Sequence, residues 1–149
     1  MEPLIVDASD GEVYDTGTLR LRVLAQAPDH PVSMTDSTVP PGFPGVVRHR
    51  HARTTDIFYV LEGELAVEVG DERHVLGPGA FALVPPGTPH TFANRGSAPA
   101  RVLNIQQPAG LEQYLKEAVK RMAAGHPWSP AEMAEIAAQY DFEPLPADG

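Results

Sequence analysis

The chain has 149 residues, no cysteine, and a net charge of −9 that results from 20 acidic and 11 basic residues. The lack of cysteine excludes disulfide bonds, thiolate ligands and thiol nucleophiles, and an acidic chain without a basic cluster is repelled by phosphate backbones, which argues against nucleic-acid binding. No apolar run approaches the ~18 residues of a membrane span, and the first residues lack the basic and apolar regions of a signal peptide. We therefore expect a cytoplasmic protein that binds neither nucleic acid nor membrane.

The first two-thirds of the chain are divided into short segments by many of its 16 prolines and 13 glycines. Between these breaks, apolar and polar residues alternate, as they do in strands that are buried on one face. Segment 56–61 has apolar residues on both faces of the strand, and we expect it to be buried on both faces between two sheets. Nine strands are predicted, at 19–25, 32–39, 46–51, 56–61, 64–69, 73–76, 80–84, 90–94 and 100–106. An all-β fold of this kind is typical of a small jelly-roll barrel.

The pattern changes after Pro108, where apolar residues recur with helical spacing from Leu111 to Met122. A second helix is predicted after Ser129, with Ser129 as N-cap, Pro130 at the first helical position and Glu132 placed to complete a capping box. The apolar face of this helix consists of Met133, Ile136, Ala137 and Tyr140, and Pro144-Leu145-Pro146 follows as a tail. We expect one domain over 1–149, with a barrel at about 12–107 and two short helices at about 110–141.

Four residues that can coordinate a metal lie on or beside the predicted strands: His49, His51, Asp56 and His90. Two histidines at i and i+2 on a strand point to the same face, with Cβ atoms roughly 6.5–7 Å apart. A single histidine is more often an ordinary surface or core residue, but this combination favours a shared site. Three imidazoles and a carboxylate suit one divalent transition metal ion, whether Fe, Ni, Mn, Co, Cu or Zn.

Strand parity also suggests which residues lie beside this site. Phe58 shares a strand face with Asp56, and Phe92 shares one with His90, so both should line the same cavity. Met34 and Asn104 are further candidates for the pocket from parity on their own strands. Core packing is the alternative role for both phenylalanines.

Two blocks of the chain resemble the two sequence motifs of the cupin superfamily. In the first motif, H-x-H is followed after four residues by a carboxylate and after six more by glycine, and here these positions are His49, His51, Asp56 and Gly63. The second motif is G-x5-P-x-G-x2-H-x3-N, and here its positions are Gly79, Pro85, Gly87, His90 and Asn94. From about Leu19 to Tyr140 the chain resembles single-domain, quercetinase-like bacterial cupins.

The chain departs from the family pattern at Asp56, where metal-binding cupins usually have glutamate. Aspartate is shorter by one C–C bond, about 1.5 Å, whereas a working site tolerates only ~0.2 Å in ligand distance. Asp56 is therefore either a metal ligand on a strand that lies closer to the ion, or a hydrogen-bond partner of a ligating water or histidine. Both alternatives remain open from the sequence.

The resemblance implies a metal-dependent dioxygenase that acts on an aromatic or enolisable small molecule. Asp56 would then act as the general base toward a substrate hydroxyl. Two alternatives remain: a Lewis-acid cyclase or isomerase of a small-molecule biosynthetic pathway, in which no oxygen is consumed, and a non-catalytic ligand-binding cupin. The resemblance also implies a homodimer paired through sheet edges.

Overall fold

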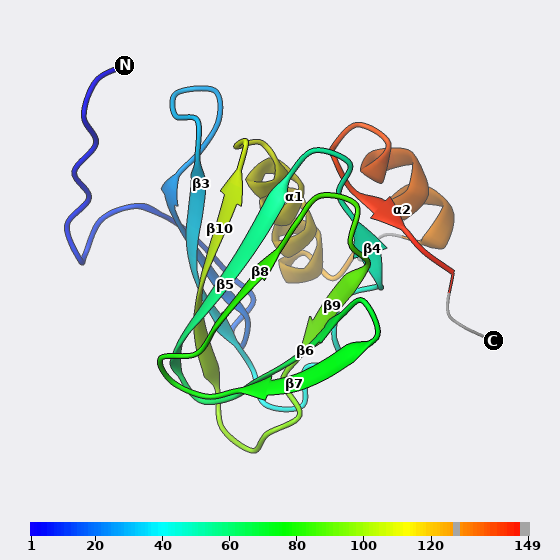
Figure 1. Cartoon of the computed structure of the whole chain (residues 1–149). Coiled ribbons are helices and arrows are strands. Elements are labelled where there is room, and N and C mark those ends of the chain that lie inside the picture. Colours follow the sequence, from blue (N-terminus) through cyan, green and yellow to red (C-terminus); the bar gives the residue numbers. More distant parts are fainter. Residues whose placement is uncertain (127–128, 147–149) are drawn as a thin grey trace.

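The computed structural model describes residues 1–126 and 129–146, except for the side chains of Pro130 and Met133. Two antiparallel sheets face each other and form a jelly roll (Figure 1). The larger sheet has the order β1 (Glu12–Asp15), β2 (Arg20–Ala25), β3 (Ser33–Val39), β10 (Ala100–Gln107), β5 (Thr55–Glu62) and β8 (Phe81–Val84). The smaller sheet has the order β11 (Glu143–Pro144), β4 (His49–Arg50), β9 (His90–Ala93), β6 (Leu65–Val69) and β7 (Glu72–Leu76). The prediction of an all-β jelly roll is confirmed.

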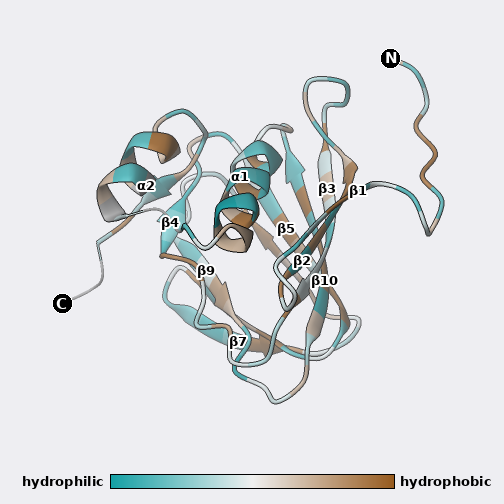
Figure 2. Cartoon of the chain, turned by 180° about the vertical axis from the view of Figure 1, so that it is seen from behind, coloured by the Kyte–Doolittle hydropathy of each residue, from teal (hydrophilic) through white to brown (hydrophobic). Residues whose placement is uncertain are grey.

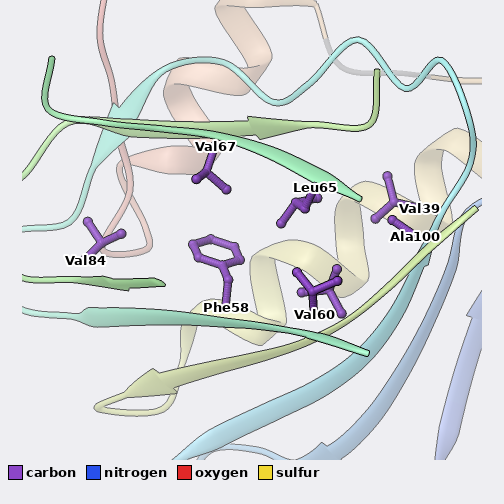
Figure 3. Close-up of a cluster of buried hydrophobic side chains, with 8 residues drawn as sticks. Val39, Phe58, Val60, Leu65, Val67, Val84 and Ala100 are labelled. Carbon is purple, nitrogen blue, oxygen red and sulfur yellow. The ribbon is translucent and has the colours of Figure 1, made fainter. Parts of the chain in front are cut away.

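The core lies between the two sheets and is built from alternate residues along the strands, those whose side chains point inward. Phe58 and Val60 point from the larger sheet toward Leu65 and Val67 of the smaller sheet (Figure 3). Val60 and Leu65 have no exposed surface. Full burial of such a side chain contributes about 1.5–3 kcal/mol to folding, so these strands hold the two sheets together near the candidate metal ligands.

One expectation for β5 was wrong. This strand is buried on one face only, because Asp56, Phe58 and Val60 point inward while Tyr59 is 39% exposed. The apolar residues of its second face lie on the outer side of the sheet. Neither β1 nor β11 was among the predicted strands, and β11 occupies part of the segment that we expected to be a tail.

The two predicted helices are present as α1 (Leu111–Ala123) and α2 (Pro130–Ala137), but α2 ends before Tyr140, which we expected on its apolar face. Helix α1 lies across the open side of the barrel and contacts β1, β2 and β3 (Figures 1 and 2). In α2, the Ser129 side chain accepts a hydrogen bond of 3.2 Å from the Glu132 backbone N–H, as an N-cap should. Ala137 is buried against α1, whereas the Met133 side chain lies outside the described part of the chain. Within the described residues, no helix is long and apolar enough to cross a membrane.

Two motif residues have structural roles. Gly63 adopts φ +72° in the turn between β5 and β6, and a side chain there would collide with the Pro99 carbonyl oxygen. The Asn94 side chain donates to the carbonyl oxygens of Val39 (3.1 Å) and Ala98 (2.9 Å), and its own oxygen accepts from the Gly96 N–H (3.0 Å). Gly63 therefore shapes the turn between β5 and β6, and Asn94 fixes the turn that follows the strand carrying His90.

Candidate metal centre

The four predicted ligand residues converge between the two sheets. His49 on β4 is the direct antiparallel partner of His90 on β9, and His51 follows β4 immediately. Asp56 reaches the same point from β5 in the opposite sheet. Their candidate ligand atoms all lie within 4.8 Å of one another, and each residue is at most 4% exposed. Pairing of β4 with β9 therefore joins the two sequence motifs into one site.

Each histidine ring is oriented by a backbone carbonyl. The Nδ1 atoms of His49 and His90 lie 2.7 and 2.9 Å from the carbonyl oxygens of Val47 and Thr88, and Nδ1 of His51 contacts the carbonyl oxygen of Asp141. A carbonyl oxygen only accepts, so Nδ1–H is the donor in all three contacts. The lone pair of each neutral ring is therefore on Nε2, where it can bind a metal ion.

The Asp56 carboxylate is held from both sides. Its Oδ2 lies 3.3 Å from Nε2 of His51 and 3.1 Å from Nε2 of His90. Its Oδ1 accepts hydrogen bonds from the side-chain amides of Asn104 (2.7 Å) and Gln106 (3.3 Å). This arrangement leaves Oδ2 directed at the histidines.

The spacing of these atoms matches that of ligands around one ion. Two ligands at ~2.1 Å from a metal are about 3.0 Å apart at a right angle and about 3.4 Å apart in a tetrahedron. The separations of 3.1 and 3.3 Å around Oδ2 lie within that range. The shorter side chain of Asp56 therefore lies at ligand distance in this fold.

The electrostatics of the cluster also favour a cation. Burial, together with the neighbouring His90 ring, lowers the pKa of His49 from its usual 6.5 to about 3, so this ring is neutral. Burial would raise the pKa of Asp56, but the contacts with His51 and His90 outweigh it and hold the pKa below its usual range. Burial likewise opposes the shift at His51, whose pKa is raised because the Asp56 carboxylate and the Asp141 carbonyl outweigh it. Lone pairs of neutral rings facing an ionised carboxylate repel it unless a proton or a metal ion lies between them.

A cavity of about 300 Å³ opens beside the cluster. It lies between the sheets and α1, and a second cavity of about 140 Å³ continues along α1 with several of the same walls. Most of the lining is aromatic or aliphatic. The lining of the larger cavity comprises Phe43, Gly45, Val46, Val47, His49, Asp56, Phe58, Phe92, Asn104, Gln106, Leu111, Tyr114, Leu115, Ala118, Met122 and Phe142.

Three of the four predicted pocket residues, Phe58, Phe92 and Asn104, line this cavity. Met34 lines neither cavity, so the prediction that it lies in the pocket was wrong. The register pairs Asn104 with Thr35, and Met34 with Ile105. Neighbouring residues on a strand point to opposite faces, so Thr35 and Asn104 share the inner face and Met34 does not.

Two residues near the centre were not anticipated from the sequence. Phe142 stacks on the His49 ring with centroids 4.2 Å apart and planes at 19°. Asp141 accepts from the His51 ring through its main chain, and its carboxylate accepts the backbone N–H groups of Ala52, Arg53 and Thr54. Neither residue belongs to a motif, and no local pattern links the end of the chain to the histidines.

Comparison with known proteins identifies a cupin domain in this chain. Residues 35–106 match the family model described as a cupin domain. The chain is 30% identical over 76 residues to the uncharacterised protein MJ1618 of Methanocaldococcus jannaschii, covering 51% of this chain and 60% of the relative. It is 29% identical over 92 residues to quercetin 2,3-dioxygenase of Bacillus subtilis, covering 60% of this chain and 27% of that enzyme.

The chain thus spans less than two-thirds of the length of each of these curated relatives. Among solved structures, TT1209 of Thermus thermophilus is 27% identical with a TM-score of 0.59. The match covers 71% of this chain and 98% of TT1209.

Proposed function

We propose that this chain, whose residues 35–106 match a cupin domain, is a metal-dependent dioxygenase of a neutral aromatic or enolisable small molecule. The observation that carries the proposal is the chemistry of the cavity next to the ligand cluster. The described residues that line the cavity include no lysine or arginine, and Asp56 is the one acidic residue among these lining residues. A polyanion such as a sugar phosphate would find no lysine or arginine to pair with in this lining and would lie beside the Asp56 carboxylate, at a cost in desolvation. A mostly apolar ring with one metal-directed oxygen fits better.

His49, His51 and His90 would hold the ion, with Asp56 as the fourth ligand. When bound, a divalent transition metal supplies Lewis acidity toward a substrate oxygen and brings molecular oxygen next to the activated carbon. The aromatic walls formed by Phe58, Phe92 and Phe142 would orient the substrate ring and exclude water.

Asp56 would also take the proton from the substrate hydroxyl. Its low pKa keeps the carboxylate ionised at neutral pH, and Oδ1 is already occupied by two amide donors. Oδ2, the oxygen without an amide donor, would then be the atom that accepts the proton. The similarity to quercetin 2,3-dioxygenase supports this choice of reaction. Both oxygen atoms would end in the products, and the substrate itself would supply the electrons.

The test is to load the metal-free protein separately with Fe, Mn, Co, Ni, Cu and Zn, and to add a flavonol or a smaller enolisable ketone. We expect oxygen uptake to equal substrate loss with at least one metal, and isotopically labelled oxygen to appear in the product. His49→Ala should abolish the reaction, whereas His74→Ala, which removes an exposed histidine on β7, should leave it unchanged. Substrate loss without oxygen uptake would replace the dioxygenase with a Lewis-acid cyclase or isomerase. Ligand binding without turnover under every metal would indicate a binding protein.

A further inference from the structure

The segment after α2, residues 140–144, returns to the barrel and lies against the metal centre. Its last two residues form β11, which pairs with β4 so that Pro144 lies opposite His49. The Leu145 N–H then donates to the Arg48 carbonyl oxygen at 2.8 Å. The end of the described chain is therefore hydrogen-bonded along the strand that carries His49.

Asp141 connects this segment to the loop between the ligands His51 and Asp56. Its Oδ1 accepts the N–H of Ala52 at 2.6 Å, and its Oδ2 accepts the N–H of Arg53 at 2.9 Å. The same Oδ2 accepts the N–H of Thr54 at 2.8 Å and the Thr54 hydroxyl at 2.7 Å. One carboxylate thus satisfies three consecutive backbone donors, and hydrogen bonds to a charged acceptor are about twice as strong as neutral ones.

The same segment contacts two of the ligand rings directly. The Asp141 carbonyl oxygen accepts the Nδ1–H of His51, and the neighbouring Phe142 ring stacks on His49. Phe142 also stacks on Tyr114 of α1, with centroids 4.7 Å apart and planes at 23°. These contacts connect the metal-ligand rings to the helix that closes the cavity.

We propose that Asp141 and Phe142 position the residues of the metal centre, with Asp141 as the main residue of the two. Docking of this segment fixes the His51 tautomer, the His49 ring plane and the loop that sets the distance from His51 to Asp56. Metal affinity therefore depends on docking, and by thermodynamic reciprocity a bound metal strengthens docking. Loss of such an outer contact typically costs 10–100-fold in metal affinity. The proposal depends on the metal site and not on the reaction that the site performs.

The first test compares Co²⁺ binding by wild type, Asp141→Asn and Glu143→Gln, with calorimetry and the visible Co²⁺ spectrum as readouts. We expect Asp141→Asn to weaken Co²⁺ binding about 10–100-fold and to alter the spectrum, because the loop and the His51 ring shift. Glu143→Gln is the matched control, since this residue lies on the same segment but pairs with the exposed Arg50 at 2.8 Å. Its affinity should stay within about twofold of wild type. Wild-type affinity and spectrum in Asp141→Asn would overturn the proposal.

The second test needs no substitution and covers the case in which Asp141→Asn is poorly folded. Hydrogen exchange of the wild-type protein is measured with and without Zn²⁺. The amides of Ala52, Arg53 and Thr54 should exchange more slowly with Zn²⁺ than without it, and peptides from β7 should not change. Bound Zn²⁺ without added protection at the three amides would overturn the proposal, whereas oxygenase activity does not enter either test. Failure of wild type to bind any metal would instead refute the site itself.

Discussion

His49 and His90 come from the two separate sequence motifs, yet they are direct cross-strand partners with ring centroids 4.3 Å apart. A single backbone pairing between β4 and β9 thus brings together two of the three imidazoles. His51 and Asp56 complete the set from the loop and from the opposite sheet. The site depends on the relative position of the two sheets as much as on its ligands.

Replacement of His51 by alanine should abolish tight metal binding. The variant loses one imidazole and the contact that ties the site to Asp141. Elemental analysis of protein purified without added metal should show the metal-to-protein ratio falling from near one to near zero. His74→Ala should keep the wild-type ratio. An unchanged ratio in His51→Ala would show that the metal lies elsewhere.

Asp56→Glu should weaken metal binding, although it restores the residue usual in related metal sites. The Asp56 carboxylate is already at ligand distance, and Asn104 and Gln106 hold its Oδ1. A longer side chain would displace these amides or push against the His51 and His90 rings, and overpacking of this kind typically costs 1–3 kcal/mol. We expect about tenfold weaker Co²⁺ binding by calorimetry. Tighter binding by the glutamate variant would show that Asp56 does not reach the ion.

The stability of the metal-free protein should fall with pH below neutrality, partly through His49. The pKa of this ring is about 3 in the folded state and 6.5 in the unfolded chain. The unfolded state therefore binds the additional proton between these values, and stability decreases as pH falls from 6.5 toward 3. His51, whose pKa is raised, acts in the opposite direction.

Urea denaturation in the presence of a chelator isolates the contribution of His49. The loss of unfolding free energy between pH 6.5 and pH 4 should be smaller in His49→Gln than in wild type. Equal losses in both proteins would contradict the assignment of a neutral, buried His49.

Ala118→Phe should block the substrate cavity and leave the metal in place. Ala118 lies on the face of α1 that lines both cavities, and a phenyl ring would fill space next to Phe58. We expect KM for an active substrate to rise at least tenfold with an unchanged metal-to-protein ratio. Glu117→Phe, on the exposed side of the same helix, is the control and should behave as wild type. A normal KM in Ala118→Phe would place the substrate elsewhere.

The amino-acid sequence by itself determined nine of the eleven described strands, the two helices and the identity of the candidate ligands. The alternation of apolar and polar residues in the strands, and the helical spacing of apolar residues from Leu111 to Met122, both reflect which face of each element is buried. These patterns therefore report local backbone geometry. The spacing of His49, His51, Asp56 and His90 was informative for the same reason, since the histidine pair lies on one local segment and the turns between strands are marked by glycine and proline.

Only the tertiary structure decided how these pieces meet. Whether Asp56 could serve as a ligand depended on the distance between two sheets and on amides from β10 that fill the space behind it. The inward position of Thr35 in place of Met34 followed from the register between β3 and β10. Asp141 and Phe142 join the site through contacts with residues about 90 positions earlier in the chain. Such contacts leave no local periodicity, because they arise from packing between distant segments and not from the conformation of either one.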